Sequence, residues 1–107
     1  MKSEKRSLTE FAEEEIRVIH SLSKKYNSSN KKDHSKALLA LMGKHMIEIK
    51  KLFENRDPHF VVETGDLVIL CLELIKEAGK SPDAVMAKCY KRYRQKLKIK
   101  SEKRKIK

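Results

Sequence analysis

The sequence has little glycine, proline or aromatic residue, and it has no tryptophan. Its 107 residues include three glycines, two prolines, three tyrosines and three phenylalanines. Turn-rich sandwiches and barrels need many more turn-forming, β-branched and aromatic residues. Lysine, glutamate, leucine, isoleucine and alanine are abundant instead, which is typical of helical proteins. This composition excludes an all-β fold and predicts one small all-α domain.

Cysteines and long hydrophobic runs are also scarce. Cys71 and Cys89 form neither a CxxC pair nor a metal-finger spacing, so we expect two reduced, buried thiols. The longest purely apolar run, from Leu67 to Leu72, is far shorter than the roughly 20 residues that span a bilayer. The first residues contain no apolar signal segment. These absences predict a cytoplasmic protein with no membrane partner.

Positive charge is concentrated at the C-terminal end. Residues 1–87 carry 15 Lys/Arg and 14 Asp/Glu, whereas residues 88–107 carry 11 Lys/Arg and a single Glu. The residues after Leu97 also lack apolar periodicity. We therefore expect a folded domain over residues 1–97 and a basic, disordered tail over residues 98–107. Such a tail is a candidate for binding nucleic acid or an acidic partner.

Apolar residues spaced by three and four positions predict four helices. We place these helices at about residues 8–26, 35–54, 59–78 and 82–97. Ser7 and Glu10 fit a capping box, Asn27 to Asp33 is a polar linker, and Gly79 followed by Ser81-Pro82-Asp83 separates the last two helices. The third helix is apolar nearly all round, so we expect it to be buried on most sides. The predicted fold is an antiparallel four-helix bundle-like domain, completed by self-association.

Acidic residues interrupt the apolar faces of the second and third helices. Glu63 and Asp66 are three residues apart, so their carboxylates share one helix face. His45 and Glu48 have the same spacing on the preceding helix. Acids often simply begin helices, and a lone histidine is usually a core residue. A buried carboxylate, however, needs a compensating cation, and the facing pairs predict a Mg²⁺ site that takes substrate phosphates as its other ligands.

A further acidic run and the absence of other motifs complete the candidate sites. Glu13-Glu-Glu15 is a weaker candidate because charge runs at helix starts are usually solvated. Glu15 falls near the apolar stripe of the first helix and could reach the same cluster. The sequence contains no Walker loop, nucleophile elbow or zinc finger.

The segment over residues 35–95 resembles the MazG-like all-α nucleotide pyrophosphohydrolases. The resemblance is strongest from Glu63-Thr-Gly-Asp66, which leads into the apolar helix and the glycine turn, to Lys88 in the last helix. It implies hydrolysis of a nucleoside triphosphate to the monophosphate and pyrophosphate, with Mg²⁺ (or Mn²⁺) held by acids on two helices. It also implies assembly as a homodimer or homotetramer.

The resemblance assigns roles to individual residues. Glu63 and Asp66 match the second acidic motif, and Glu48 matches the last acid of the first motif, whereas Lys44 and His45 stand where the family has two further acids. The first metal motif is therefore degenerate. The residues implied for the metal are Glu48, Glu63, Asp66 and His45, with Glu48 or Glu63 orienting or deprotonating the attacking water. The residues implied for the phosphates are Lys88, Lys91 and Arg92, the last of which stands where the family commonly has Asn.

Two other function classes remain open. One is a non-enzymatic helical module that binds nucleic acid or an acidic partner through its basic C-terminus. The other is a di-iron carboxylate bundle, which needs two Glu-x-x-His pairs and two further acids. The chain has one such pair in reversed order, at His45 and Glu48. The acids within apolar faces favour the enzyme, whereas Lys44, His45 and the basic tail favour the binding module.

Overall fold

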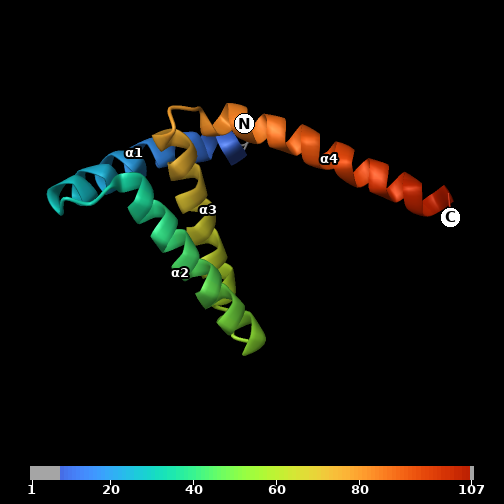
Figure 1. Cartoon of the computed structure of the whole chain (residues 1–107), viewed down its shortest axis with the longest axis horizontal. Coiled ribbons are helices and arrows are strands. Elements are labelled where there is room, and N and C mark those ends of the chain that lie inside the picture. The colour runs from blue at the N-terminus through green and yellow to red at the C-terminus, as the bar shows by residue number, and fades with distance from the viewer. Residues whose placement is uncertain (1–7, 107) are drawn as a thin grey trace, which may run out of the picture.

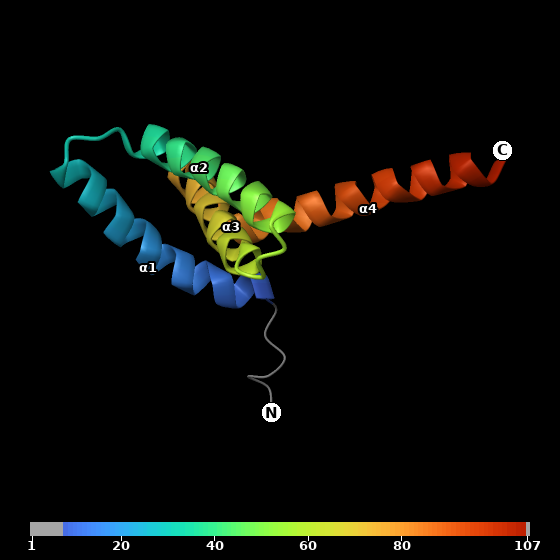
Figure 2. The same cartoon turned by 90° about the horizontal axis from the view of Figure 1, so that it is seen from below.

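The computed structural model describes residues 8–106, with side chains described from residue 13 to residue 103. It contains four helices: α1 (Leu8–Ser29), α2 (His34–Glu54), α3 (Phe60–Glu77) and α4 (Pro82–Ile106). Helices α2 and α3 lie side by side as an antiparallel hairpin, α1 lies across one end of this hairpin, and α4 extends away from it (Figure 1, Figure 2). The predicted all-α class and helical-bundle character are confirmed.

Short polar signals mark the helix ends. The Asp33 carboxylate accepts a hydrogen bond from the backbone N–H of Lys36 at 3.1 Å and thereby caps α2. Gly79 follows α3 in the left-handed region, with φ of 82°, where glycine has no steric penalty. The Ser81 hydroxyl accepts from the backbone N–H of Ala84 at 3.2 Å at the start of α4. The signals around Gly79 and Ser81 are those that the sequence predicts.

The linker between the first two helices is shorter than predicted. Helix α1 continues to Ser29, so Asn27 lies inside a helix and is buried. Its side-chain amide pairs with the ring of His34 at 2.7 Å, and this pairing meets the hydrogen-bonding need of a buried amide. The capping box predicted at Ser7 and Glu10 lies outside the residues whose side chains are described.

The apolar core is small. Among residues 13–103 the buried apolar side chains are Ile16, Leu38, Leu70 and Leu72, with Pro82 at the start of α4. The expectation that α3 is buried on most sides is met only in part, because Val61, Val62 and Val68 are 62%, 53% and 51% exposed. A single chain thus leaves part of its most apolar helix in contact with water. None of the described helices is long and apolar enough to cross a membrane.

Helix α4 is anchored only at its start. Its first turns pack on α1 and α3, and within the described residues it makes no contact with α2. The Glu13 carboxylate accepts from the backbone N–H of Asp83 at 2.9 Å and from the Ser81 hydroxyl at 3.3 Å. Glu13 therefore holds the N-terminus of α4, where a negative charge is favourable, whereas Glu14 and Glu15 are exposed.

The C-terminal segment differs from the predicted disordered tail. Helix α4 continues through residues 98–106 to Ile106. A lysine-rich stretch without glycine or proline has good intrinsic helix propensity, even with no apolar face to pack. Every residue from 87 to 103 is exposed.

The projecting helix makes the chain extended. The Cα radius of gyration of the chain is 17.1 Å, whereas about 13 Å is expected for a compact domain of this length. Its accessible surface is 9113 Å², compared with about 6,200 Å² expected for a compact protein of 12.5 kDa. The chain therefore exposes more surface than a compact monomer of the same size.

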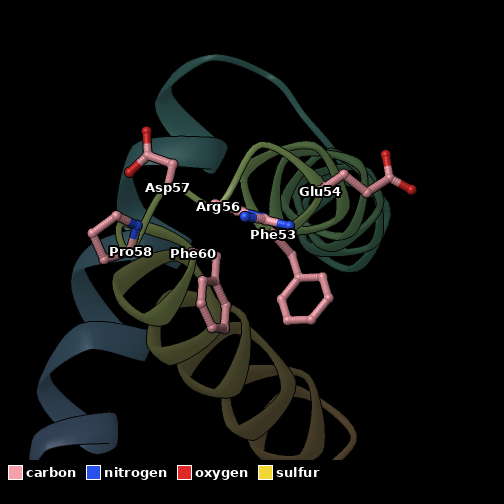
Figure 3. Close-up of a pocket in the computed structure, with 6 residues that line it drawn as sticks. All are labelled: Phe53, Glu54, Arg56, Asp57, Pro58 and Phe60. Carbon is pink, nitrogen blue, oxygen red and sulfur yellow. The ribbon is translucent and has the colours of Figure 1, made fainter.

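The turn between α2 and α3 forms a hollow (Figure 3). The rings of Phe53 and Phe60 meet edge to face in it, with centroids 5.3 Å apart. The carboxylates of Glu54 and Asp57 point away from these rings. The hollow is lined mainly by apolar atoms and has no converging acids, so it does not resemble a cation or phosphate site.

Candidate metal centre

Three of the predicted site residues lie together between α2 and α3. Nε2 of His45 lies 3.5 Å from Oε1 of Glu63 and 3.9 Å from Oδ2 of Asp66. One ligand atom from each residue lies within 4.8 Å of the other two. The three-residue spacing puts both acids on one face of α3, and the antiparallel hairpin turns this face toward α2. We call His45, Glu63 and Asp66 the hairpin cluster.

The ring of His45 is oriented by its own helix. Its Nδ1–H donates to the backbone carbonyl of Leu41 at 2.9 Å. This hydrogen bond leaves Nε2 as the nitrogen that faces Glu63 and Asp66. Histidines that bind metals show the same pattern, because an N–H bonded to a carbonyl fixes the tautomer and orients the other nitrogen as the ligand.

The distances within the hairpin cluster leave room for a small cation. They exceed the length of an ordinary hydrogen bond. Two ligands about 2.1 Å from an ion lie about 3.0 Å apart at a right angle and about 3.4 Å apart at a tetrahedral angle. The side chains of His45 and Glu63 are 22% and 21% exposed, whereas that of Asp66 is 50% exposed. The cluster is therefore accessible to a ligand from the side of Asp66.

His59 is a neighbour of this cluster that the sequence analysis missed. Its Nε2 lies 3.7 Å from Oε2 of Glu63, so the Glu63 carboxylate has one imidazole near each oxygen. The signal in the sequence is the four-residue spacing of His59 and Glu63.

The structure does not bring the remaining predicted residues into the hairpin cluster. Glu48 is exposed on α2, one turn after His45. Lys88, Lys91 and Arg92 are exposed on α4, which leaves the hairpin (Figure 1) and does not contact α2 within the described residues. One chain thus offers three cation ligands without the predicted phosphate-binding side chains beside them.

A second group of potential ligands joins three helices. Nε2–H of His20 on α1 donates to Oε1 of Glu77 on α3 at 2.9 Å, and the ring of His34 on α2 packs edge to face on His20 with centroids 5.4 Å apart. One ligand atom from each residue lies within 4.8 Å of the others. We call these three residues the junction cluster. The sequence analysis missed it because its members lie far apart along the chain.

The electrostatics of the junction cluster favour an ionised carboxylate. The hydrogen bond from His20 holds the pKa of Glu77 below its ordinary value. Lys24, whose Nζ lies 3.4 Å from Oε1 of Glu77, acts in the same direction, whereas partial burial opposes both. Glu77 is thus present as an anion between two imidazoles.

The two thiols differ in their surroundings. Cys71 is half-buried on α3, and burial raises its pKa. Cys89 is exposed on α4, which corrects the expectation of two buried thiols. The predicted burial failed at Cys89 because α4 leaves the body of the protein soon after its start. Neither cysteine belongs to the hairpin cluster or the junction cluster.

Comparisons with known proteins do not assign this chain to a family. No protein-family model, no curated protein and no solved structure matches it. The features of the molecule that indicate a function are the two side-chain clusters, the charge distribution and the position of α4.

Proposed function

We propose that the chain is a Mg²⁺- or Mn²⁺-dependent nucleoside triphosphate pyrophosphohydrolase, which releases a nucleoside monophosphate and pyrophosphate. The observation that carries this proposal is the convergence of His45, Glu63 and Asp66 between two antiparallel helices. The resemblance to the MazG-like enzymes supports it, because Glu63 and Asp66 match their second acidic motif. The orientation of the His45 ring by Leu41 gives further support.

The donor set of the hairpin cluster fits one divalent cation. Two carboxylates suit Mg²⁺ and Mn²⁺, and one imidazole shifts the preference toward Mn²⁺. We propose one cation rather than two, because Lys44 and His45 replace two acids of the first motif. A bound cation would offset the charge of the triphosphate and make its phosphorus easier to attack.

The protein's own residues would position the water and accept its proton. Asp66 and His45 hold the site, and Glu63 lies between them and His59. We assign to Glu48, which is exposed one turn along α2 from His45, the role of accepting a proton from water. In this scheme the water oxygen bonds to phosphorus, the bond to the pyrophosphate oxygen breaks, and the proton passes to Glu48 or Glu63.

The phosphate contacts require a second copy of the chain. Lys88, Lys91 and Arg92 lie on α4, which extends away from the hairpin cluster of its own chain (Figure 1). Tyr90, Tyr93 and Leu97 on the same helix are 49%, 65% and 51% exposed. We propose that α4 of one copy packs on the hairpin of another in a homodimer or homotetramer, which buries these side chains together with the exposed valines of α3.

The oligomer is tested separately from the chemistry. Light scattering at micromolar concentration should give a molar mass of at least twice 12.5 kDa. A well-folded monomer at high micromolar concentration would contradict the proposed assembly.

Pyrophosphate release tests the proposed reaction. A panel of ribo- and deoxynucleoside triphosphates is incubated with Mg²⁺, with Mn²⁺ or with a chelator, and we expect release only with a metal. Asp66→Asn and Glu63→Gln should each lower the rate by about 100-fold or more, because they remove a ligand. Glu54→Gln is the matched control, since Glu54 is an exposed acid at the end of α2. Release that survives chelation, or full activity of Asp66→Asn, would refute the proposal.

A second function is favoured by the exposure of α4. Residues 88–107 carry 11 Lys/Arg and one Glu, and the described part of this segment is helical and exposed. A row of cations on a projecting helix binds polyanions by releasing counterions. The exposed rings of Tyr90 and Tyr93 could stack on unpaired bases. Binding of nucleic acid through α4 is therefore the alternative, and it requires that no second copy buries Tyr90 and Tyr93.

A further inference from the structure

We propose that the junction cluster, His20, His34 and Glu77, is a Zn²⁺ site that ties α1, α2 and α3 together. His34 is the first residue of α2, Glu77 is the last residue of α3, and His20 lies in α1, which crosses this end of the hairpin (Figure 1). The proposal does not rest on the proposed hydrolysis. Eleven residues along α2 separate His34 from His45, which is about 16 Å of helix, so the two clusters cannot share one ion.

A buried and unpartnered nitrogen points to a ligand at this junction. His34 is 7% exposed, and its Nε2 has no hydrogen-bond partner among the described residues. Its other ring nitrogen, Nδ1, is occupied by the side-chain amide of Asn27 at 2.7 Å. Buried polar atoms are almost always paired. The unpaired Nε2 therefore needs a partner, and a cation supplies one.

Asn27 has the role expected of an outer partner. In the structure the amide nitrogen of Asn27 lies 2.7 Å from Nδ1 of His34 and donates to it, which leaves the ring proton on Nε2. A half-turn of the Asn27 amide exchanges its nitrogen and oxygen, so that Nδ1–H donates to Oδ1 and Nε2 has the lone pair that a cation needs. This is how residues behind a metal site commonly fix the tautomer of a ligating histidine. The pair is buried, so water does not compete for the hydrogen bond.

The donor set indicates Zn²⁺ rather than Mg²⁺. Two imidazoles and one carboxylate form a well-known set of three protein ligands for Zn²⁺, with water in the fourth position. Nε2 of His20 and Oε1 of Glu77 are 2.9 Å apart, and small side-chain rotations would bring all three donors to the spacing of about 3.4 Å of a tetrahedral site. To bind the ion through Nε2, His20 would carry its ring proton on Nδ1, and any second proton would pass to water.

A second buried group would also gain from a cation here. Glu73 precedes Glu77 by one turn on α3, which places both on one helix face. It is 3% exposed, and its Oε1 has no hydrogen-bond partner among the described residues. A positive ion nearby would lower the cost of burying this carboxylate. The ion would thus compensate for the small apolar core by joining three helices.

The test is metal binding by the full chain in a His45→Ala background, which removes the imidazole of the hairpin cluster. Metal-free protein is titrated with Zn²⁺ by calorimetry and with Co²⁺ by visible absorption. We expect one equivalent, and a Co²⁺ spectrum without a thiolate charge-transfer band. The melting temperature should rise by on the order of 10 °C at 100 times the Kd. Absence of binding in this background would overturn the proposal.

Further variants locate the ion. His34→Ala and Glu77→Gln should weaken binding by about 100-fold or more, and Asn27→Ala by about 10-fold through the outer partner. His59→Ala is the matched control and should bind normally. Equal loss in His59→Ala, or unchanged binding in His34→Ala, would overturn the assignment. If the ligand variants do not fold, X-ray absorption of the Zn²⁺-loaded parent decides: two imidazoles and no sulfur support the site, and any other ligand set refutes it.

Whether this experiment succeeds is independent of the proposed hydrolysis. Zn²⁺ binding in the His45→Ala background says nothing about pyrophosphate release, and loss of release in Asp66→Asn leaves the junction cluster intact. Each proposal can therefore fail in its own experiment while the other proposal holds.

Discussion

The α2–α3 hairpin and α4 are both helical, yet they relate to the rest of the molecule in opposite ways. The hairpin brings ligating side chains together across two helices and contributes Leu38, Leu70 and Leu72 to the core. Helix α4 is packed only at its start, and residues 87–103 are exposed. Forming a helix and positioning it are thus separate problems. Local propensity is enough for the first, whereas the second needs apolar surface on a neighbour.

The two regions also differ in charge. The hairpin combines acids and histidines at close range, whereas α4 carries most of the chain's excess positive charge. An acidic cluster on one region and a basic helix on the other are complementary. This complementarity favours contact between α4 of one copy and the hairpin of another.

The largest expected effect compares one leucine from each region. Leu38 on α2 is 1% exposed and Leu97 on α4 is 51% exposed. Leu38→Ala should lower the free energy of unfolding by about 2–5 kcal/mol, because it removes buried surface and leaves a cavity. Leu97→Ala should cost less than about 0.5 kcal/mol in a monomer. Urea denaturation followed by circular dichroism measures both, and a comparable cost at Leu97 would show that a second copy buries α4.

The next effect concerns the cation of the hairpin. Mg²⁺ or Mn²⁺ at 100 times its Kd should raise the free energy of unfolding by about 2.7 kcal/mol, because it binds only the folded chain. Asp66→Asn should remove this gain, while Glu54→Gln should keep it. Thermal unfolding with and without metal provides the measurement. If neither metal changes the free energy of unfolding of the wild-type protein, the hairpin site loses its main support.

A smaller effect on stability separates α4 from the folded body. Deletion of residues 98–107 removes six cations (Lys98, Lys100, Lys103, Arg104, Lys105 and Lys107). The side chains of residues 98–103 are exposed, so among these residues the deletion removes no packed side chain. We expect the melting temperature and hydrolysis to change little. The slope of log K against log salt concentration for binding to duplex DNA should become less steep, by up to about 5 if each cation neutralises one phosphate.

Two results would contradict the separation of hydrolysis at the hairpin cluster from polyanion binding at the end of α4. A truncated protein that stays folded but loses nucleotide hydrolysis would place the end of α4 in the enzyme. Unchanged affinity for DNA, measured by fluorescence anisotropy over a range of salt, would exclude the end of α4 as the polyanion site.

The smallest expected effect compares the two cysteines. Cys71 should react with iodoacetamide several-fold more slowly than Cys89, because burial raises its pKa and lowers the thiolate fraction. Mass spectrometry of the alkylated peptides against time measures both rates. If Cys89 becomes protected as the protein concentration rises, a second copy covers α4. Constant reactivity of Cys89 at every concentration would speak against such packing.

The sequence predicts the helices better than it predicts their surroundings. The four helices and the signals at Gly79 and Ser81 follow from local chemistry, because periodicity, capping and φ are properties of a few adjacent residues. The polar residues from 27 to 33 predict a linker at Asn27, whereas its burial depends on His34, a partner in the next helix. Residues 98–106 were expected to be disordered because they lack an apolar face, although their helix propensity is high.

For the candidate sites, too, the sequence predicts what lies within one helix but not what packing between helices brings together. Glu63 and Asp66 could be paired from sequence because three residues always separate them by less than one helical turn. That His45 joins them depends on how α2 and α3 align, and that Glu48 stays exposed outside the cluster depends on the same alignment. The junction cluster forms only where three helices meet, so no spacing along the chain predicts it.

By itself the sequence determined the helical class, the approximate helix ends, the charge asymmetry and the pairing of acids on α3, because these follow from neighbours within a few residues. Only the tertiary structure decided which face of each helix meets another. That choice placed His45 between two carboxylates, brought His20, His34 and Glu77 to one point, and left α4 outside. The physical reason is that contacts between distant segments depend on how whole apolar surfaces fit, and that fit is not encoded in any short stretch of chain.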